Sequence, residues 1–388
     1  MGARGRWARA CAAASAVMVV AAVAGLAGAG SARAANPGVV MTWGSDADGQ
    51  LGNGSAGGHL KGAAVPGLTN VIDMHGGREH VVALKKDGTV WTWGHNNDGQ
   101  LGDGTKTNRP APVQVKGLTG VRDVATGHYS TLALKTDGTV WAWGLNNFGQ
   151  LGNGTTTTST VPVRVKGLTS VIQIAGARDH SLAVKSDGTV WAWGDNQFGN
   201  LGNGTTKNSD VPVQVEGLAN VIRIAGGRDH SLAIEANGSV WAWGWNQYGQ
   251  VGDRTKTNRL TPVKVGGLPA AARQVAAGAN HSLARLANGT VWAWGQNSFG
   301  QVGDGTGVGR LTPVKVAGIA NAINIGAGRL HSLAIEKDRS VWAWGDNDFG
   351  QLGDGTTTNR MKPVRVPGVT GGEQVAGGRD YSVALVRP

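Results

Sequence analysis

Histidine recurs along this 388-residue chain at an interval close to fifty residues. Two positions of the series hold serine or tyrosine instead, so that it reads His80, Ser130, His180, His230, His281, His331 and Tyr381. Imidazoles bind metals, but a zinc site needs all its ligands within about 2.0–2.1 Å of one ion. Each histidine here begins a different predicted strand in a different repeat. We therefore expect structural histidines, each bonding the backbone of its own repeat.

The other patterns that could carry chemistry are incomplete. Serine follows most of these histidines, but a catalytic serine needs one unique base and a third orienting group. The segment GQLGDG lacks the lysine of a phosphate-binding loop. SDADGQ at Ser45 and NNDGQ at Asn96 resemble parts of a calcium loop without its distal glutamate. The sequence therefore predicts no catalytic residues, no cofactor and no metal site.

The elements that must position these residues form a repeat. Segments such as TVWAWG place a tryptophan at a spacing of fifty, with one step of fifty-one: Trp43, Trp93, Trp143, Trp193, Trp243, Trp294 and Trp344. Each repeat contains four short β-prone runs separated by glycine-containing turns, and Asp-Gly marks a hairpin between the second and third runs. Four strands per repeat without helical periodicity are typical of a β-propeller.

The two ends of the repeat array complement each other. VVMTWG from Val39 begins a third-and-fourth-strand half, and EQVAGGRDYSVALV from Glu373 supplies a first-and-second-strand half. Together they make one blade that closes a ring and leaves no free sheet edge, whereas a solenoid does not need complementary ends. We predict one all-β domain in residues 35–388, a seven-bladed β-propeller with four-stranded blades and a split closing blade.

The paired tryptophans are predicted to be core residues. Side chains alternate along a strand, so Trp91 and Trp93 project to the same side. Flat blades need wide, rigid side chains between them, and we expect both members of each pair to fill that space.

The N-terminal residues predict export. Arg4, Arg6 and Arg9 precede an apolar stretch, and Ala32-Arg33-Ala34 ends it with a small-x-small cleavage pattern. We expect a signal peptide in residues 1–34, cleaved after Ala34, and a secreted chain without a membrane span, although a single membrane anchor is the competing interpretation. The only cysteine, Cys11, lies in this segment, so the mature chain has no disulfide.

The formal net charge of +11 is spread along the chain without a block of five like charges. This pattern does not predict nucleic-acid binding.

The motif WGxNxxGQLGxGT followed by VxxIAxGxxHSLALxxDGxV resembles the regulator of chromosome condensation repeat family. WGHNNDGQLGDGT at Trp93 and WGLNNFGQLGNGT at Trp143 match it closely, and the resemblance extends from Val39 to Val386. It implies a seven-bladed propeller, but not one function.

Three functions are associated with the family. Nuclear members exchange guanine nucleotides through an inserted β-hairpin wedge; here the spacing grows by only one residue, within Pro269 to Ala272, and an exported chain does not meet a cytosolic GTPase. The plant UV-B photoreceptor uses tryptophans in its first-to-second-strand turns, which contain none here. A secreted β-lactamase-inhibiting propeller is the nearest functional analogue, but its contact turns are rich in aromatic residues.

Candidate partner-binding residues are those at which a repeat departs from its own pattern. Trp245 and Tyr248 place large aromatic residues in one loop, and Arg254 replaces a glycine in that loop. Tyr129, beside His128, replaces a turn acid, and Tyr381 replaces a histidine. Tyrosine and tryptophan are enriched at binding hot spots.

Arginine recurs in the first-to-second-strand turns and completes the candidate set with Arg78, Arg178, Arg228, Arg329 and Arg379. Acids follow most of these arginines. The turns can therefore form blade-to-blade ion pairs, or a charged rim that recognises an acidic partner or pairs two propellers face to face.

We expect a secreted, non-catalytic propeller that binds an extracellular protein or envelope component through loops at one end of the ring, as a monomer or a face-to-face dimer. One alternative is an extracellular enzyme with its site in the central channel, which a cluster of strongly perturbed titratable residues there would favour. Another is a structural protein held to the anionic cell envelope.

Overall fold

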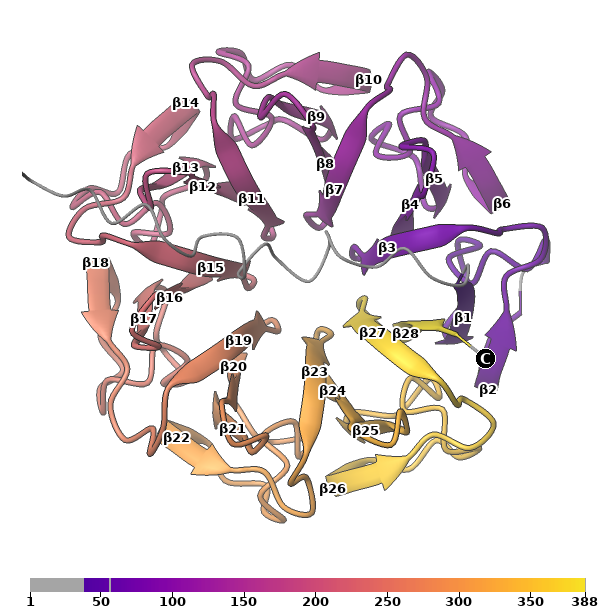
Figure 1. The fold of residues 1–388 in the computed structure, drawn as a ribbon, viewed down its shortest axis with the longest axis vertical. Coiled ribbons are helices and arrows are strands. Elements are labelled where there is room, and N and C mark those ends of the chain that lie inside the picture. The colour runs from indigo at the N-terminus through magenta and orange to yellow at the C-terminus, as the bar shows by residue number, and fades with distance from the viewer. Residues whose placement is uncertain (1–37, 56, 388) are drawn as a thin grey trace, which may run out of the picture.

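The computed structural model describes residues 38–55 and 57–387, and all 28 strands in these residues belong to seven four-stranded antiparallel sheets. Figure 1 shows the sheets arranged radially as the blades of a ring. The predicted seven-bladed propeller is confirmed. The predicted signal peptide lies outside the described residues.

The strands of each blade are numbered from the central channel outward. Blade 1 contains β3 (Val71–Gly76), β4 (His80–Lys85), β5 (Val90–Gly94) and β6 (Arg109–Gln114). Blade 2 contains β7 (Val121–Thr126), β8 (Ser130–Lys135), β9 (Val140–Gly144) and β10 (Ser159–Arg164). Blade 3 contains β11 (Val171–Gly176), β12 (His180–Lys185), β13 (Val190–Gly194) and β14 (Ser209–Gln214). Blade 4 contains β15 (Val221–Gly226), β16 (His230–Glu235), β17 (Val240–Gly244) and β18 (Arg259–Lys264). Blade 5 contains β19 (Ala272–Ala277), β20 (His281–Leu286), β21 (Val291–Gly295) and β22 (Arg310–Lys315). Blade 6 contains β23 (Ala322–Ala327), β24 (His331–Glu336), β25 (Val341–Gly345) and β26 (Arg360–Arg365). Blade 7 contains β27 (Gly372–Gly377), β28 (Tyr381–Val386), β1 (Val39–Gly44) and β2 (His59–Ala64).

Blade 7 is the split closing blade. Its sheet order is β2-β1-β28-β27, so the two ends of the repeat array share one sheet. β1 pairs with β28 along its whole length, from Val39 opposite Val386 to Gly44 opposite Tyr381. The ring is therefore closed by an antiparallel ladder between its first and last segments.

One tryptophan in each blade fills the contact between neighbouring blades. These side chains, the second of each pair and Trp43, are fully buried. Trp193 of blade 3 donates its indole N–H to the Gln150 carbonyl of blade 2 at 2.9 Å. Gly152 lies beneath that indole with φ +65°, and a Cβ there would lie 2.7 Å from Trp193 Nε1. The glycine of the GQLG motif is thus needed for the close approach.

The first tryptophan of each pair is only half-buried, which corrects the prediction that both are core residues. Trp91 packs against the same apolar cluster as Trp93, so the two do share a side. The rest of its ring is covered by the Lys85 ammonium, 5.2 Å from the ring centre. The position lies at the edge of the interface between blades, where a lysine stem and solvent complete the surroundings.

The buried histidines join neighbouring blades, which corrects the prediction that they bond their own backbone. His180 Nε2 lies 2.8 Å from the Ser231 hydroxyl of blade 4, and that hydroxyl donates to the Asn200 carbonyl of blade 3. Because the hydroxyl hydrogen is used in this way, Nε2 must be the donor and the imidazole is neutral. The same contact recurs in the pairs His80–Thr131, His230–Ser282, His281–Ser332 and His331–Ser382.

Tyr381 is a core residue, so its prediction as a partner-binding residue was wrong. Its side chain is fully buried, and its hydroxyl lies 3.0 Å from the Gly77 carbonyl and 2.6 Å from the His80 carbonyl. Blade 1 has Val81 where other blades have the serine or threonine that meets the histidine. A histidine at position 381 would lack that partner, whereas tyrosine reaches backbone carbonyls instead.

Candidate functional site

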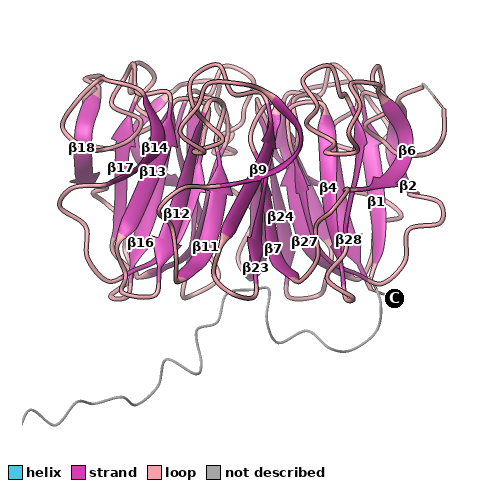
Figure 2. Cartoon of the chain, turned by 90° about the horizontal axis from the view of Figure 1, so that it is seen from above, coloured by secondary structure: helices cyan, strands magenta, loops and turns pink. Residues whose placement is uncertain are grey.

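Two sets of loops meet at one end of the ring, which we call the turn face. The third strand of a blade ends beside the start of the second, as Gly94 opposite His80 shows. The first-to-second-strand turns and the third-to-fourth-strand loops therefore share this end, opposite the marked C-terminus in Figure 2. All the candidate binding residues except the buried Tyr381 belong to these turns and loops.

Three of the turn arginines pair with an acid of the next blade. Arg178 lies 3.1 Å from Asp229, Arg329 lies 2.8 Å from Asp380, and Arg379 lies 2.8 Å from Glu79. The hydrogen bond from Glu79 raises the pKa of the Arg379 guanidinium. Because the arginines are partly exposed, each pair contributes little to stability. The charged turns thus include blade-to-blade contacts around the channel mouth.

Tyr129 changes this pattern at the boundary between blades 1 and 2. Without an acid to pair with, the Arg78 guanidinium lies 5.0 Å from the Tyr129 ring centre, a cation–π contact. His128 meets the same ring edge-on, with the centres 6.4 Å apart. Burial, and then the charges of Arg178, Arg78 and Arg228, lower the pKa of His128 to about 3. His128 is therefore neutral at physiological pH.

Aromatic side chains form the main apolar feature of the turn face. We call this set the aromatic arc: Phe148, Phe198, Trp245, Tyr248, Phe299 and Phe349. Trp245 lies between Phe198 and Tyr248, with ring centres 5.9 and 5.5 Å away, and the Arg228 guanidinium is 5.8 Å from its ring. Phe148, Tyr248 and Phe349 are 37%, 42% and 51% exposed. These rings are accessible to a partner.

Sequence reasoning identified Trp245 and Tyr248 but missed the phenylalanines of the arc. Each phenylalanine matches its repeat, so none departs from the pattern. The signal was compositional, because all four phenylalanines of the chain occupy one position of the repeat. A residue type confined to one exposed loop position indicates a surface role more directly than a single exception does.

Arg254 adopts the backbone conformation of the glycine that it replaces. Its φ is +70°, and its N–H donates to the Leu311 carbonyl at 3.1 Å. Gly104 makes the equivalent bond to Thr160 in blade 1. The predicted strained backbone is confirmed, and the loop keeps its path while an exposed cation is added close in sequence to Tyr248.

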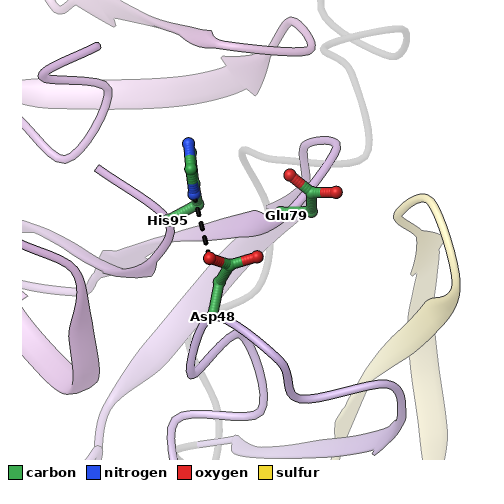
Figure 3. A group of neighbouring side chains, drawn as sticks. All are labelled: Asp48, Glu79 and His95. Atoms are coloured by element: carbon green, nitrogen blue, oxygen red, sulfur yellow. Dashed lines mark hydrogen bonds and ion pairs between the residues drawn. The ribbon is translucent and has the colours of Figure 1, made fainter. Parts of the chain in front are cut away.

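A polar patch of Asp48, Glu79 and His95 interrupts the arc between blades 7 and 1 (Figure 3). Asp48 and Asp98 hold the position at which blades 2 to 6 have an aromatic residue. His95 Nδ1 lies 3.1 Å from Asp48, and Asn108 donates to the same carboxylate. Glu79 is paired with Arg379, so both carboxylates already have partners.

The central channel has a volume of about 1430 Å³ and contains a second polar cluster. Asp73 and His75 on β3 lie close to Asp123 on β7. Burial, and then the Asp73 charge, raise the pKa of Asp123 to about 7. Burial opposes ionisation of Asp73 too, but the His75 charge and hydrogen bonds from His75 and Gln374 lower its pKa overall. Sequence reasoning missed this cluster, although all three residues depart from the repeat.

Comparison with known proteins identifies the repeat. A model of the RCC1-like domain matches residues 12–272. Models of the regulator of chromosome condensation (RCC1) repeat match residues 272–301 and 322–351, and also residues 288–335 and 338–385. The chain belongs to the RCC1 repeat family, as its motifs predicted.

Solved structures show the same fold. Prp20p from Saccharomyces cerevisiae is 24% identical, with a TM-score of 0.82 over 91% of this chain and 92% of that protein. Yeast RCC1 (Prp20) bound to Kap60 gives 23% identity and a TM-score of 0.81 over 91% of this chain and 89% of that one. Human WBSCR16 is 25% identical, with a TM-score of 0.80 over 90% of this chain and 99% of that protein.

Within the described residues, no helix is long and apolar enough to cross a membrane.

Proposed function

We propose that this protein is an exported, non-catalytic propeller that binds another protein through its turn face. The aromatic arc carries this proposal. Its rings extend over five consecutive blades on one end of a rigid ring, and several are more than one-third exposed. Aromatic residues and arginine dominate the energetics of protein interfaces, and exposed apolar groups gathered on one face mark interaction sites.

Trp245 is the predicted anchor of this interface. It contacts Phe198, Tyr248 and Arg228 and is itself only partly covered. Its neighbours hold the indole in place before a partner arrives, so little side-chain entropy is lost on binding. The polar patch at blades 7 and 1 gives the same face a direction, because a partner that lies across the ring meets apolar rings on one side and carboxylates on the other.

The structural relatives support protein binding as the class of function. Prp20p was studied for its binding to Gsp1p and histones, and yeast RCC1 (Prp20) was solved bound to Kap60. Guanine-nucleotide exchange finds no support in the described strands, since all of them belong to the seven blades and none forms an added hairpin. The proposed partner is instead an extracellular protein or a protein of the cell envelope.

Capture of the partner tests this proposal. The full chain would be immobilised as wild type, as Trp245→Ala and as Val161→Ala, and each would be exposed to secreted and envelope proteins. Val161 is an apolar residue 40% exposed on the outer strand of blade 2, so it is a control for loss of exposed apolar surface outside the arc. Mass spectrometry should identify a protein that wild type and Val161→Ala retain and Trp245→Ala loses. Equal retention by all three folded proteins contradicts the proposed interface.

Export is proposed from the N-terminal residues alone. N-terminal sequencing of the protein from the culture medium should begin at Ala35. Protein found only inside the cell, with its first residues intact, contradicts export and the choice of an extracellular partner.

The state of association is part of the same proposal. A monomer leaves the turn face free, whereas a face-to-face dimer covers it. Light scattering of wild type and Trp245→Ala distinguishes these states, because a dimer that uses the arc should dissociate in the variant.

A second function class is favoured by one specific observation. An enzyme with its site in the channel requires perturbed titratable groups there, and Asp73, His75 and Asp123 provide them. The protein-binding proposal rests on accessible rings rather than on this cluster. What the cluster itself can bind is a separate question.

A further inference from the structure

The channel cluster arises where two adjacent blades depart from the repeat at facing positions. The third residue of the first strand is an amide or arginine in the remaining blades: Gln173, Arg223, Gln274, Asn324 and Gln374. Blades 1 and 2 have Asp73 and Asp123 instead. Two residues further along the strand, blade 1 has His75 where every other blade has alanine or glycine.

The usual residue at this position has a clear structural task. Gln274 Nε2 donates to the Ile325 carbonyl at 3.0 Å, and its Oε1 accepts from the Ile325 N–H at 3.2 Å. The amide therefore clamps its blade to the next one. An aspartate has no donor for the carbonyl, so Asp73 and Asp123 give up half of this contact and place negative charge in the channel wall.

The three side chains present their ligand atoms to one another. One donor atom of Asp73, His75 and Asp123 lies within 4.8 Å of each of the others. His75 Nε2 and Asp73 Oδ1 are 3.5 Å apart, close to the ~3.4 Å edge expected of a tetrahedral site with bonds of about 2.0–2.2 Å. Gln374 Nε2 donates to Asp73 Oδ1 at 2.8 Å and so orients this carboxylate from blade 7.

The two neighbouring guanidinium groups do not neutralise the carboxylates. Arg122 donates to the Val171 carbonyl at 2.7 Å, and Arg223 donates to the Ile222 carbonyl at 2.7 Å. Among the described residues, Asp123 makes no ion pair, and Asp73 pairs only with His75. A desolvated pair of carboxylates with a single imidazole leaves a place for a cation.

We propose that Asp73, His75 and Asp123 bind one divalent transition-metal ion, of which Zn²⁺ is the reference case, in the wall of the central channel. The three protein ligands leave at least one coordination position open to the channel. The His75 side chain is 38% exposed there, which gives the ion a route of entry. The sequence predicted no metal site because the three residues lie on two strands about fifty residues apart.

The donor set selects the class of metal. Imidazole together with carboxylates suits zinc and the neighbouring first-row ions, whereas calcium prefers six to eight oxygen ligands. Three donors, one of them nitrogen, are too few and too soft for calcium. The polar patch on the turn face is a poorer site because its carboxylates already bond Arg379, Asn108 and His95.

Titration of the metal-free full chain with ZnCl₂ tests this proposal. Isothermal calorimetry at about pH 7.5, where imidazole is neutral, should show one saturable site in the wild type. His75→Ala and Asp123→Gln should each weaken Zn²⁺ binding by about tenfold or more. Both variants introduce the residue that other blades have at that position, so both should fold, which circular dichroism checks.

The matched control is His95→Leu, which removes the histidine of the polar patch and introduces the residue that blade 2 has at Leu145. It should bind Zn²⁺ like the wild type, and excess CaCl₂ should not displace the ion. Absence of saturable Zn²⁺ binding to the wild type overturns the proposal. Binding kept by His75→Ala, or lost in His95→Leu, also overturns it, since the ion then lies elsewhere.

Discussion

The interfaces between blades and the turn face are built from the same repeat, but they differ in how much the repeat varies. At the interfaces, a tryptophan, a hydroxyl and a loop carbonyl recur with nearly constant distances, as Trp193 and Trp344 show with indole bonds of 2.9 Å each. On the turn face, the equivalent positions range from Asp98 to Trp245 and Arg254. Only the interfaces must fit a neighbouring blade on both sides.

This difference separates the residues that hold the ring together from those available for function. A departure at an interface is compensated locally, as Tyr381 compensates for Val81. A departure on the turn face or in the channel has no such compensation, and the new side chain remains available. Four changes test where this division lies.

Acid should have the largest effect, because the interfaces contain buried neutral histidines. Burial lowers the pKa of His80, His180, His230, His281 and His331 to about 3. The unfolded chain therefore takes up these protons first, so stability is fully present above the unfolded pKa of about 6.5 and is lost as pH falls toward 3. We expect a loss of about 2 kcal/mol per histidine at pH 5.

Urea unfolding between pH 7 and 5 measures this loss. His180→Ser, which introduces the residue of Ser130, should reduce the pH dependence by about one proton. An unchanged dependence would show that His180 is not neutral and buried.

Trp193→Ala should be the most destabilising of the single substitutions. It removes a fully buried indole and its bond to Gln150, and truncation of a buried tryptophan costs about 3–5 kcal/mol. Thermal unfolding measures the change. Trp191→Ala, at the half-buried neighbouring position, should cost less, and equal costs for both variants would contradict the distinction between them.

Arg254→Gly should stabilise the fold modestly. A non-glycine residue with φ near +70° costs about 1–2 kcal/mol, and glycine removes that cost while keeping the N–H bond to Leu311. A midpoint of denaturation at or below that of the wild type would mean that the arginine side chain makes a compensating contact.

Trp245→Ala should have the smallest effect on stability, within about 0.5 kcal/mol, as is usual for surface substitutions. Its effect should appear in partner binding instead. A clear loss of stability would place Trp245 among the structural residues and transfer the anchor role to Tyr248.

The fold could be predicted almost completely from the sequence, because a fifty-residue period, Asp-Gly hairpins and complementary ends act locally and repeat. The partners of individual side chains could not. The contact of His180 with Ser231 and the approach of Asp73 to Asp123 both join different blades. They depend on the angle between blades, which the period alone does not specify. Burial of Tyr381 follows from the same angle.

The pairing of β1 with β28 also determines how the molecule can be held. Val39 and Val386 are paired at the end of the ring away from the turn face, so both ends of the ring-forming chain emerge from that end. A bead, a fused reporter or a surface joined through either terminus is therefore attached behind the ring. Immobilisation in this way displays the aromatic arc to the surrounding medium without a change to any loop.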